Sequence, residues 1–211
     1  MNGWTIALII YVLASTGSFA PVARILLKDV ELHPGGPSFD DSPHFSDDAK
    51  VRLQQHYDRM HGALSYWKSQ TAKHKAFYNY CLIWITLATA SVPFLAQAIT
   101  GDPQSKWLVT TIGAHAAILL AFSRAFRVEN NFKAFRHGES EFYDLRRRLL
   151  DRPALFGKTE AEQLDSYFEQ VEVIRRSIRV SETDNFPSIE DITPVRHANG
   201  DSSTPPTPPG A

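Results

Sequence analysis

The chain has 211 residues, with 22 lysines and arginines against 23 aspartates and glutamates, and a single cysteine. This length fits one domain with tails. A net charge of −1 argues against a nucleic-acid-binding protein, because no surplus of cations is present to replace phosphate counterions. A lone Cys81 excludes a disulfide within the chain.

The first segment, residues 1–28, is predicted to be an apolar helix that spans a membrane. Its stretch from Trp4 to Ala20 contains no Asp, Glu, Lys or Arg. A signal peptide is disfavoured, because "MNGW" lacks the basic residues that normally precede the apolar run. Arg24 and Lys28 favour an N-terminus outside the cell and a cytoplasmic C-terminal end. A helix that lies in the membrane interface remains an alternative.

Residues 29–45 are predicted to be a flexible linker. The run "ELHPGGPSFDDSPHFSDD" is rich in Pro, Gly, Ser and Asp, and such a composition offers little apolar area to bury. At its end, Ser46 is predicted to cap a helix whose first turn carries Asp47 and Asp48. A domain of residues 46–182 is expected to begin there.

Two apolar stretches in this domain predict an all-α membrane protein built on a transmembrane hairpin of two long antiparallel helices. The spans are expected at about 79–100 and 106–124, since about 20 apolar residues cross a hydrocarbon core. Gly101, Asp102 and Pro103 form the turn between them. The alternative is a buried helical hairpin in a soluble core.

The hairpin is expected to continue into cytoplasmic arms. Apolar or small residues recur at alternating steps of four and three, which is a heptad seam: Leu53, Tyr57, Met60, Leu64, Trp67, Thr71, His74, Tyr78 and Cys81. The second arm carries the matching seam of Val128, Phe132, Phe135, Glu139, Phe142, Leu145 and Leu149.

Basic residues set the expected orientation. Many flank the two spans on the arm side, whereas the turn between the spans carries only Lys106 beside Asp102: Lys50, Arg52, Arg59, Lys68, Lys73, Lys75, Arg124, Arg127, Lys133, Arg136 and Arg146 to Arg148. The positive-inside rule therefore places the arms and the C-terminus in the cytoplasm, with the protein in the cell (inner) membrane.

Glu139 is the one carboxylate on an apolar seam. Such a group needs a charged or hydrogen-bonded partner when buried. Equal rise along two antiparallel arms places it level with Leu64 to Lys68. Tyr66, Trp67 or Lys68 is therefore the expected donor, with Arg136 adding a pair on the same helix; a solvent-facing Glu139 is the alternative.

A third cytoplasmic helix is expected after Pro153 and Gly157. Thr159 and Glu162 match a capping box, and an apolar stripe follows: Leu164, Phe168, Val171, Ile174 and Ile178. This stripe either packs on the arms in a small bundle or forms a dimer seam, and both remain open. Residues 183–211 are predicted to be a disordered, Pro-rich tail.

Polar residues inside the spans are candidates for the lining of a pore. They are Thr86, Thr89, Pro93 and Gln97 in the first span and Thr111 and His115 in the second. A single hairpin cannot enclose a channel, so a pore requires a homo-oligomer in the lipid bilayer. The alternative is structural, because Thr hydroxyls bond their own helix backbone and small residues let helices approach.

The sequence carries no recognisable catalytic or metal-binding motif. His56 and His61 are five residues apart and do not share a helix face, which disfavours a metal site. The chain is therefore expected not to be an enzyme and to need no cofactor.

The stretch "YWKSQTAKHKAFYNYCLIW", Pro93 and the stretch "NNFKAFRHGESEFYDL" resemble the SLATT family over roughly residues 46–182. Trp67, Gln70, Pro93, Phe135, Arg136 and Glu139 carry the resemblance. It implies a two-transmembrane effector of bacterial conflict systems that forms pores when a nucleotide signal arrives. A nucleotide-sensing or nucleotide-synthetase protein is then the implied partner. The extra N-terminal apolar segment departs from the family pattern.

Two functions follow from these expectations. The first is a pore-forming or membrane-perturbing effector in a nucleotide-signalled defence system. The second is a non-conducting membrane scaffold whose cytoplasmic bundle docks a soluble partner.

Overall fold

The computed structural model describes residues 2–30, 32, 38–99, 101 and 103–184. Over these residues it is helical and contains no strand. Its elements in chain order are α1 (Gly3–Leu27), α2 (Asp47–Gln97), α3 (Pro103–Ala125), α4 (Val128–Asp151), the short 3-10 helix η1 (Pro153–Leu155) and α5 (Glu160–Asp184). The all-α prediction is confirmed.

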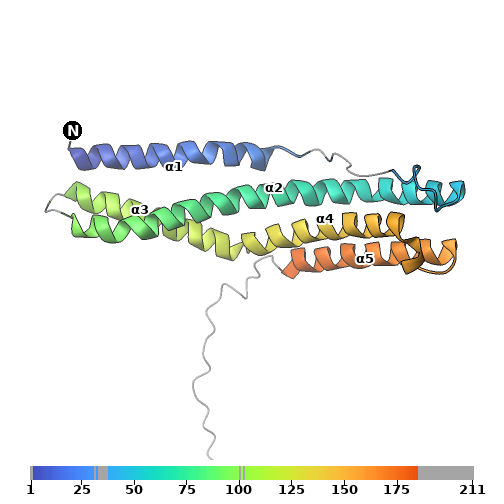
Figure 1. Ribbon diagram of the computed structural model, residues 1–211. Helices are drawn as coiled ribbons and strands as arrows, with labels where there is room; N and C mark the ends of the chain where they lie inside the picture. Colours follow the sequence, from blue (N-terminus) through green and yellow to red (C-terminus); the bar gives the residue numbers. More distant parts are fainter. Residues whose placement is uncertain (1, 31, 33–37, 100, 102, 185–211) are drawn as a thin grey trace, which may run out of the picture.

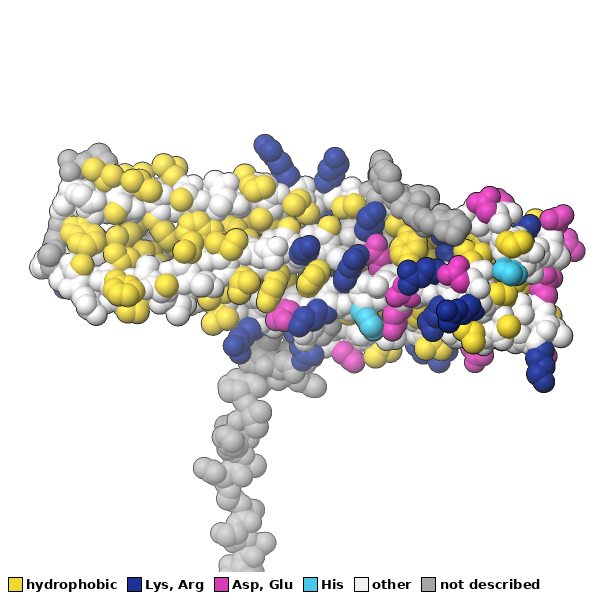
Figure 2. Space-filling view, viewed as in Figure 1, with side chains coloured by type: hydrophobic (Ala, Val, Ile, Leu, Met, Phe, Trp, Pro, Cys, Tyr) yellow, Lys and Arg dark blue, Asp and Glu magenta, His cyan; other side chains and the backbone are white. Residues whose placement is uncertain are grey.

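The long helix α2 connects two bundles placed end to end (Figure 1). It has 51 residues, which at about 1.5 Å per residue gives a rod of about 75 Å. Along its C-terminal half it packs with α1 and α3, and along its N-terminal half with α4 and α5. We call these the apolar half and the charged half, because the Lys, Arg, Asp and Glu side chains gather on the second (Figure 2).

Among the described residues, three helices are long and apolar enough to cross a membrane: α1, α2 and α3. Of the 18 most apolar consecutive residues in each helix, between 11% and 17% are buried inside the protein. Most of this apolar surface therefore faces outward, as expected of helices that meet lipid rather than a soluble core.

The core of the charged half follows the predicted seams. Leu53 and Leu64 of α2 and Phe142 and Leu149 of α4 are fully buried together. Every predicted seam residue of α2 from Leu53 to Thr71 is buried. The alternation of four and three thus identified the inward face correctly.

Helix α5 packs on α4 of the same chain. Its predicted stripe is buried at Leu164, Val171 and Ile178, and Phe168 is partly buried. Within the chain, the stripe is therefore used for a bundle helix. The neighbouring Tyr167 is fully buried as well, which the stripe did not include.

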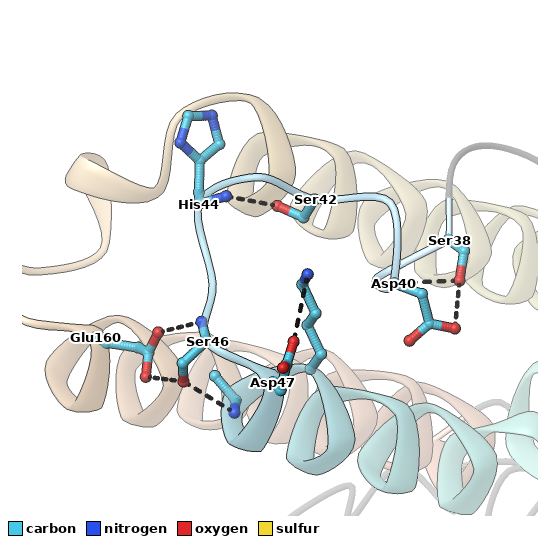
Figure 3. Close-up of polar contacts among 9 residues, drawn as sticks. Ser38, Asp40, Ser42, His44, Ser46, Asp47 and Glu160 are labelled. Carbon is cyan, nitrogen blue, oxygen red and sulfur yellow. Dashed lines mark hydrogen bonds and ion pairs between the residues drawn. The ribbon is translucent and has the colours of Figure 1, made fainter.

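Both predicted helix starts are confirmed. The Ser46 hydroxyl accepts a bond from the Ala49 N–H at 3.3 Å. Thr159 and Glu162 form the reciprocal capping box, with both bonds at 3.3 Å. Glu160 of α5 also accepts bonds from the N–H and the hydroxyl of Ser46, each at 2.7 Å (Figure 3). The first turns of α2 and α5 are thereby joined.

The segment before α2 differs from the expected flexible linker. In its described part, Phe39 and Phe45 are buried in the core of the charged half, and Ser42 is buried too. The two phenylalanines supply apolar area that the surrounding Pro, Gly, Ser and Asp residues do not. Residues 31 and 33–37, as well as 185–211 of the predicted tail, lie outside the described residues.

The second arm is not one continuous helix, contrary to the expected pair of long helices. It breaks between α3 and α4, where Arg127 adopts a left-handed conformation with φ 42° and ψ 45°. This conformation is uncommon for a residue with a side chain. Neither Gly nor Pro stands there, so no local pattern predicted the break.

Candidate functional site

The predicted polar residues of the first span lie on one open face of α2. Thr86, Thr89, Pro93 and Gln97 are all exposed. The helix faces its neighbours with other residues, among them Cys81 and Ala88, which are buried. The four residues, which we call the α2 stripe, therefore point away from α1 and α3 of their own chain.

The α2 stripe lies beside an apolar strip on the same helix. Ile83, Leu87 and Phe94 are 56%, 54% and 74% exposed. At about 100° per residue, these three lie to one side of Thr86 and Gln97. Thr89 partly satisfies its own polarity, because its hydroxyl donates to the Ile85 carbonyl at 2.7 Å.

His115 lies away from the α2 stripe, inside the apolar half. It lies between α1, α2 and α3, where the Tyr11 hydroxyl and His115 Nδ1 are 2.7 Å apart. The rings of Trp84 and Tyr80 stand 5.8 Å and 6.5 Å from the imidazole. An intramembrane His normally finds such a polar partner or lines a water-filled path; here Tyr11 is the partner.

Two further bonds tie α1 to α2 around this junction. The Tyr80 hydroxyl donates to the Ser15 carbonyl at 3.2 Å, and the Trp84 indole N–H donates to the Ser18 hydroxyl at 3.0 Å. The structure thus divides the predicted pore residues: the α2 stripe is open, whereas His115 joins helices within one chain. Thr111 is half-buried on α3.

Glu139 is buried in the charged half, with a side chain 10% exposed. Its predicted level is confirmed: a Cβ built on the adjacent Gly138 would lie 3.9 Å from the Trp67 ring. Its partner is Arg136 on the same helix, with Nη1 3.1 Å from Oε2. Glu139 is therefore buried, and the alternative of a solvent-facing Glu139 is wrong.

The expected donors on the opposite arm do not reach this carboxylate within the described part of the chain. The Tyr66 hydroxyl instead donates to Glu182 of α5 at 2.6 Å. Burial and this bond raise the pKa of Tyr66 to about 12. Trp67 is buried in the core, and Lys68 makes no bond to Glu139. Tyr66 bonds Glu182 because α5 lies beside this part of α2. The patterns of the two arms did not specify where α5 packs.

A buried cation is the polar feature of the charged half that the sequence analysis missed. Arg146, counted there as a flanking charge, is buried. Its guanidinium lies over the rings of Phe39 and Tyr57, 4.8 Å and 4.9 Å from their centres. Such stacking is favourable for a desolvated Arg. The phenylalanine of the supposed linker thus has a specific partner on α4.

The joint between α3 and α4 is held by two side chains. Arg127 Nη1 donates to the carbonyl of Asp184, the last residue of α5, at 2.6 Å. The Asn131 amide donates to the Phe126 carbonyl at 3.1 Å. The C-terminal end of α5 therefore contacts the point where the apolar half meets the charged half.

Among the residues that the structure describes, no group of three or more His, Cys, Asp and Glu side chains is placed to hold a metal ion. The arrangement that stands out is a polar stripe on the surface of an apolar bundle, which one continuous helix joins to a charged bundle. No family model, curated protein or solved structure matches the chain.

Proposed function

We propose that this protein is a membrane effector, in which several copies surround a pore lined by the α2 stripe. In this arrangement α1, the C-terminal half of α2 and α3 span the inner membrane. The charged half is cytoplasmic, and α2 with α3 forms the transmembrane hairpin.

Charge placement supports this orientation. At the turn between α2 and α3, Lys106 is the only basic residue among those that the structure describes. The other end of the apolar half carries Arg24, Lys73, Arg124 and Arg127. Basic residues favour the cytoplasmic side. The described start of α1 contacts the start of α3 through Thr5 and Gln104, so the N-terminus belongs to the outer side.

The observation that carries the proposal is the exposure of the α2 stripe. In a single chain surrounded by lipid, the polar groups of Thr86 and Gln97 would face the bilayer, which is unfavourable without hydrogen-bonding partners. No other helix that the structure describes covers this face. Several copies that turn the stripe inward would place it against water and leave Ile83, Leu87 and Phe94 for lipid or neighbouring copies.

The resemblance to the SLATT family supports the same proposal on separate grounds. It implies that a nucleotide signal, delivered by a sensor or synthetase protein, opens the pore and arrests the cell. The charged half is where such a partner would act, because α2 continues from it into the apolar half without a break.

Expression in bacterial cells tests the proposal. We expect the chain to depolarise the cell membrane, measured with a voltage-sensitive dye, and Gln97→Leu to reduce depolarisation at equal membrane content. Phe94→Leu is the control, because it changes the same part of α2 on the lipid side. Wild-type protein that inserts and self-associates without depolarising cells would favour the scaffold function.

A further inference from the structure

A groove of about 540 Å³ lies between α2 and α3, close to the joint with α4. This volume is within the range of small-molecule sites. Its walls come from two helices that would span the membrane and from the first residues of the charged half. The groove adjoins the α2 stripe, because Leu82 stands one turn before Thr86 on the same face of α2. Its charged residues lie at the end away from the stripe.

The groove changes from apolar to charged along the helix axes. Leu82 and Ile85 of α2 and Leu120 of α3 line one end. Because α2 runs away from the charged half and α3 runs toward it, these three residues lie deeper in the apolar half than the rest. This end therefore presents hydrocarbon at the depth of lipid acyl chains.

The other end carries cations. Arg124 and Arg127 line it together with Asn130 and Glu129. The carboxylate of Glu129 is held by Lys133 at 2.6 Å. Two arginines and a lysine against one glutamate leave an excess of positive charge at the level where a phosphate headgroup would stand. Arg127 Nη1 also donates to the Asp184 carbonyl, so this end of the groove lies at the joint with α5.

We propose that this groove binds one anionic phospholipid of the cytoplasmic leaflet, with its phosphate at Arg124 and Arg127 and an acyl chain along Leu82 and Leu120. The inference rests on the proposed insertion of α2 and α3 in the membrane. Basic pockets between spans on the cytoplasmic side suit anionic headgroups. A free phosphate would use the charged end alone and leave the apolar end without an occupant.

The lipid would sit against the joint of α3 and α4. It would contact Arg127, whose left-handed backbone makes the break and whose side chain bonds the end of α5. Lipid composition would thereby affect how the charged half is held against the membrane.

Native mass spectrometry of the full chain in detergent tests this, after addition of equal amounts of phosphatidylglycerol and phosphatidylcholine. We expect phosphatidylglycerol to be retained preferentially. Arg124→Gln should weaken its retention about fivefold, the effect of about 1 kcal/mol per basic residue near anionic lipid. Arg24→Gln is the matched control. Arg24 lies in the last turn of α1, at the cytoplasmic end of the proposed spans but outside the groove, so lipid retention should change little.

A second pair of variants tests the apolar end. Leu82 and Leu87 are 51% and 54% exposed on different sides of α2. Leu82→Trp should fill the groove and reduce retention, whereas Leu87→Trp should not. Equal retention of both lipids, or equal effects of Arg124→Gln and Arg24→Gln, would overturn the proposal. Displacement of the lipid by inorganic phosphate would show a phosphate site instead.

Resistance of the wild type to carbonate extraction from membranes separates this test from the proposed function. If the protein is extracted, the insertion itself is wrong. If it resists extraction but shows no lipid preference, only the lipid site is wrong.

Discussion

Adding one methyl group at Gly138 tests how α5 packs on α4. A Cβ at this position would lie 1.9 Å from Ile178 Cδ1 and 2.6 Å from Ile178 Cγ1. Carbon atoms in contact normally stay about 3.5–4.0 Å apart. The Ile178 side chain, or α5 with it, must therefore move in the Gly138→Ala variant.

Two opposing effects set the magnitude. Overpacking of a tight contact costs about 1–3 kcal/mol, while replacing Gly by Ala inside a helix gains about 1 kcal/mol. We expect Gly138→Ala to lower the free energy of unfolding by up to about 2 kcal/mol. Gly62 of α2 is the matched control, because a Cβ there meets nothing within 4 Å. Gly62→Ala should stabilise by about 0.5–1 kcal/mol.

Unfolding of the full chain in detergent, followed by circular dichroism, measures both variants. A double variant completes the test: in an Ile178→Ala background the clash is absent, so Gly138→Ala should become neutral or stabilising there. If Gly138→Ala and Gly62→Ala stabilise equally in the wild-type background, α5 does not pack on this part of α4. The bundle assignment of α5 would then fail.

Two further predictions concern the charged half. Glu139→Leu should change the free energy of unfolding by less than about 1 kcal/mol, because its partner Arg136 is 64% exposed and stays solvated; a loss of about 3–5 kcal/mol would instead show a buried partner across the arms. Burial against Phe168, more than the nearby Arg59, lowers the pKa of His56 below its usual 6.5. Folded protein then binds fewer protons than unfolded protein, so stability is retained above about pH 6.5 and falls as the pH drops toward the lowered pKa. His56→Phe should flatten this fall in unfolding measured between about pH 7 and pH 5, and a slope unchanged from the wild type would contradict the assignment.

The sequence predicted the parts of this fold that depend on local patterns. The seam of α2 and the stripe of α5 follow from spacing alone, since residues three and four apart share a helix face. Ser46 and the pair Thr159–Glu162 follow from capping chemistry. The level of Glu139 against Trp67 followed from counting equal rise on two arms.

The rest depends on contacts that no local pattern encodes. Tyr66 bonds Glu182 because α5 returns along the arms, a placement that the seam of α2 does not determine. Phe39 is buried in the core beneath the Arg146 guanidinium, a contact between segments far apart in the sequence. The break at Arg127 is held by the end of α5, and no Gly or Pro marked it. The spacing of polar residues identified the polar face of α2. It did not show that His115 lies apart from this face, because that depends on where α1 packs.

The central claim, that the α2 stripe faces water in a pore, is tested most directly by cysteine accessibility on one helix. In a Cys81→Ala background, single cysteines replace Thr86 and Gln97 on the stripe and Leu87 and Phe94 on the lipid side. A charged, water-soluble thiol reagent is then applied to the protein in membranes. The account predicts rapid modification at Thr86→Cys and Gln97→Cys and slow modification at Leu87→Cys and Phe94→Cys. Equal reactivity at the adjacent positions 86 and 87 would contradict it.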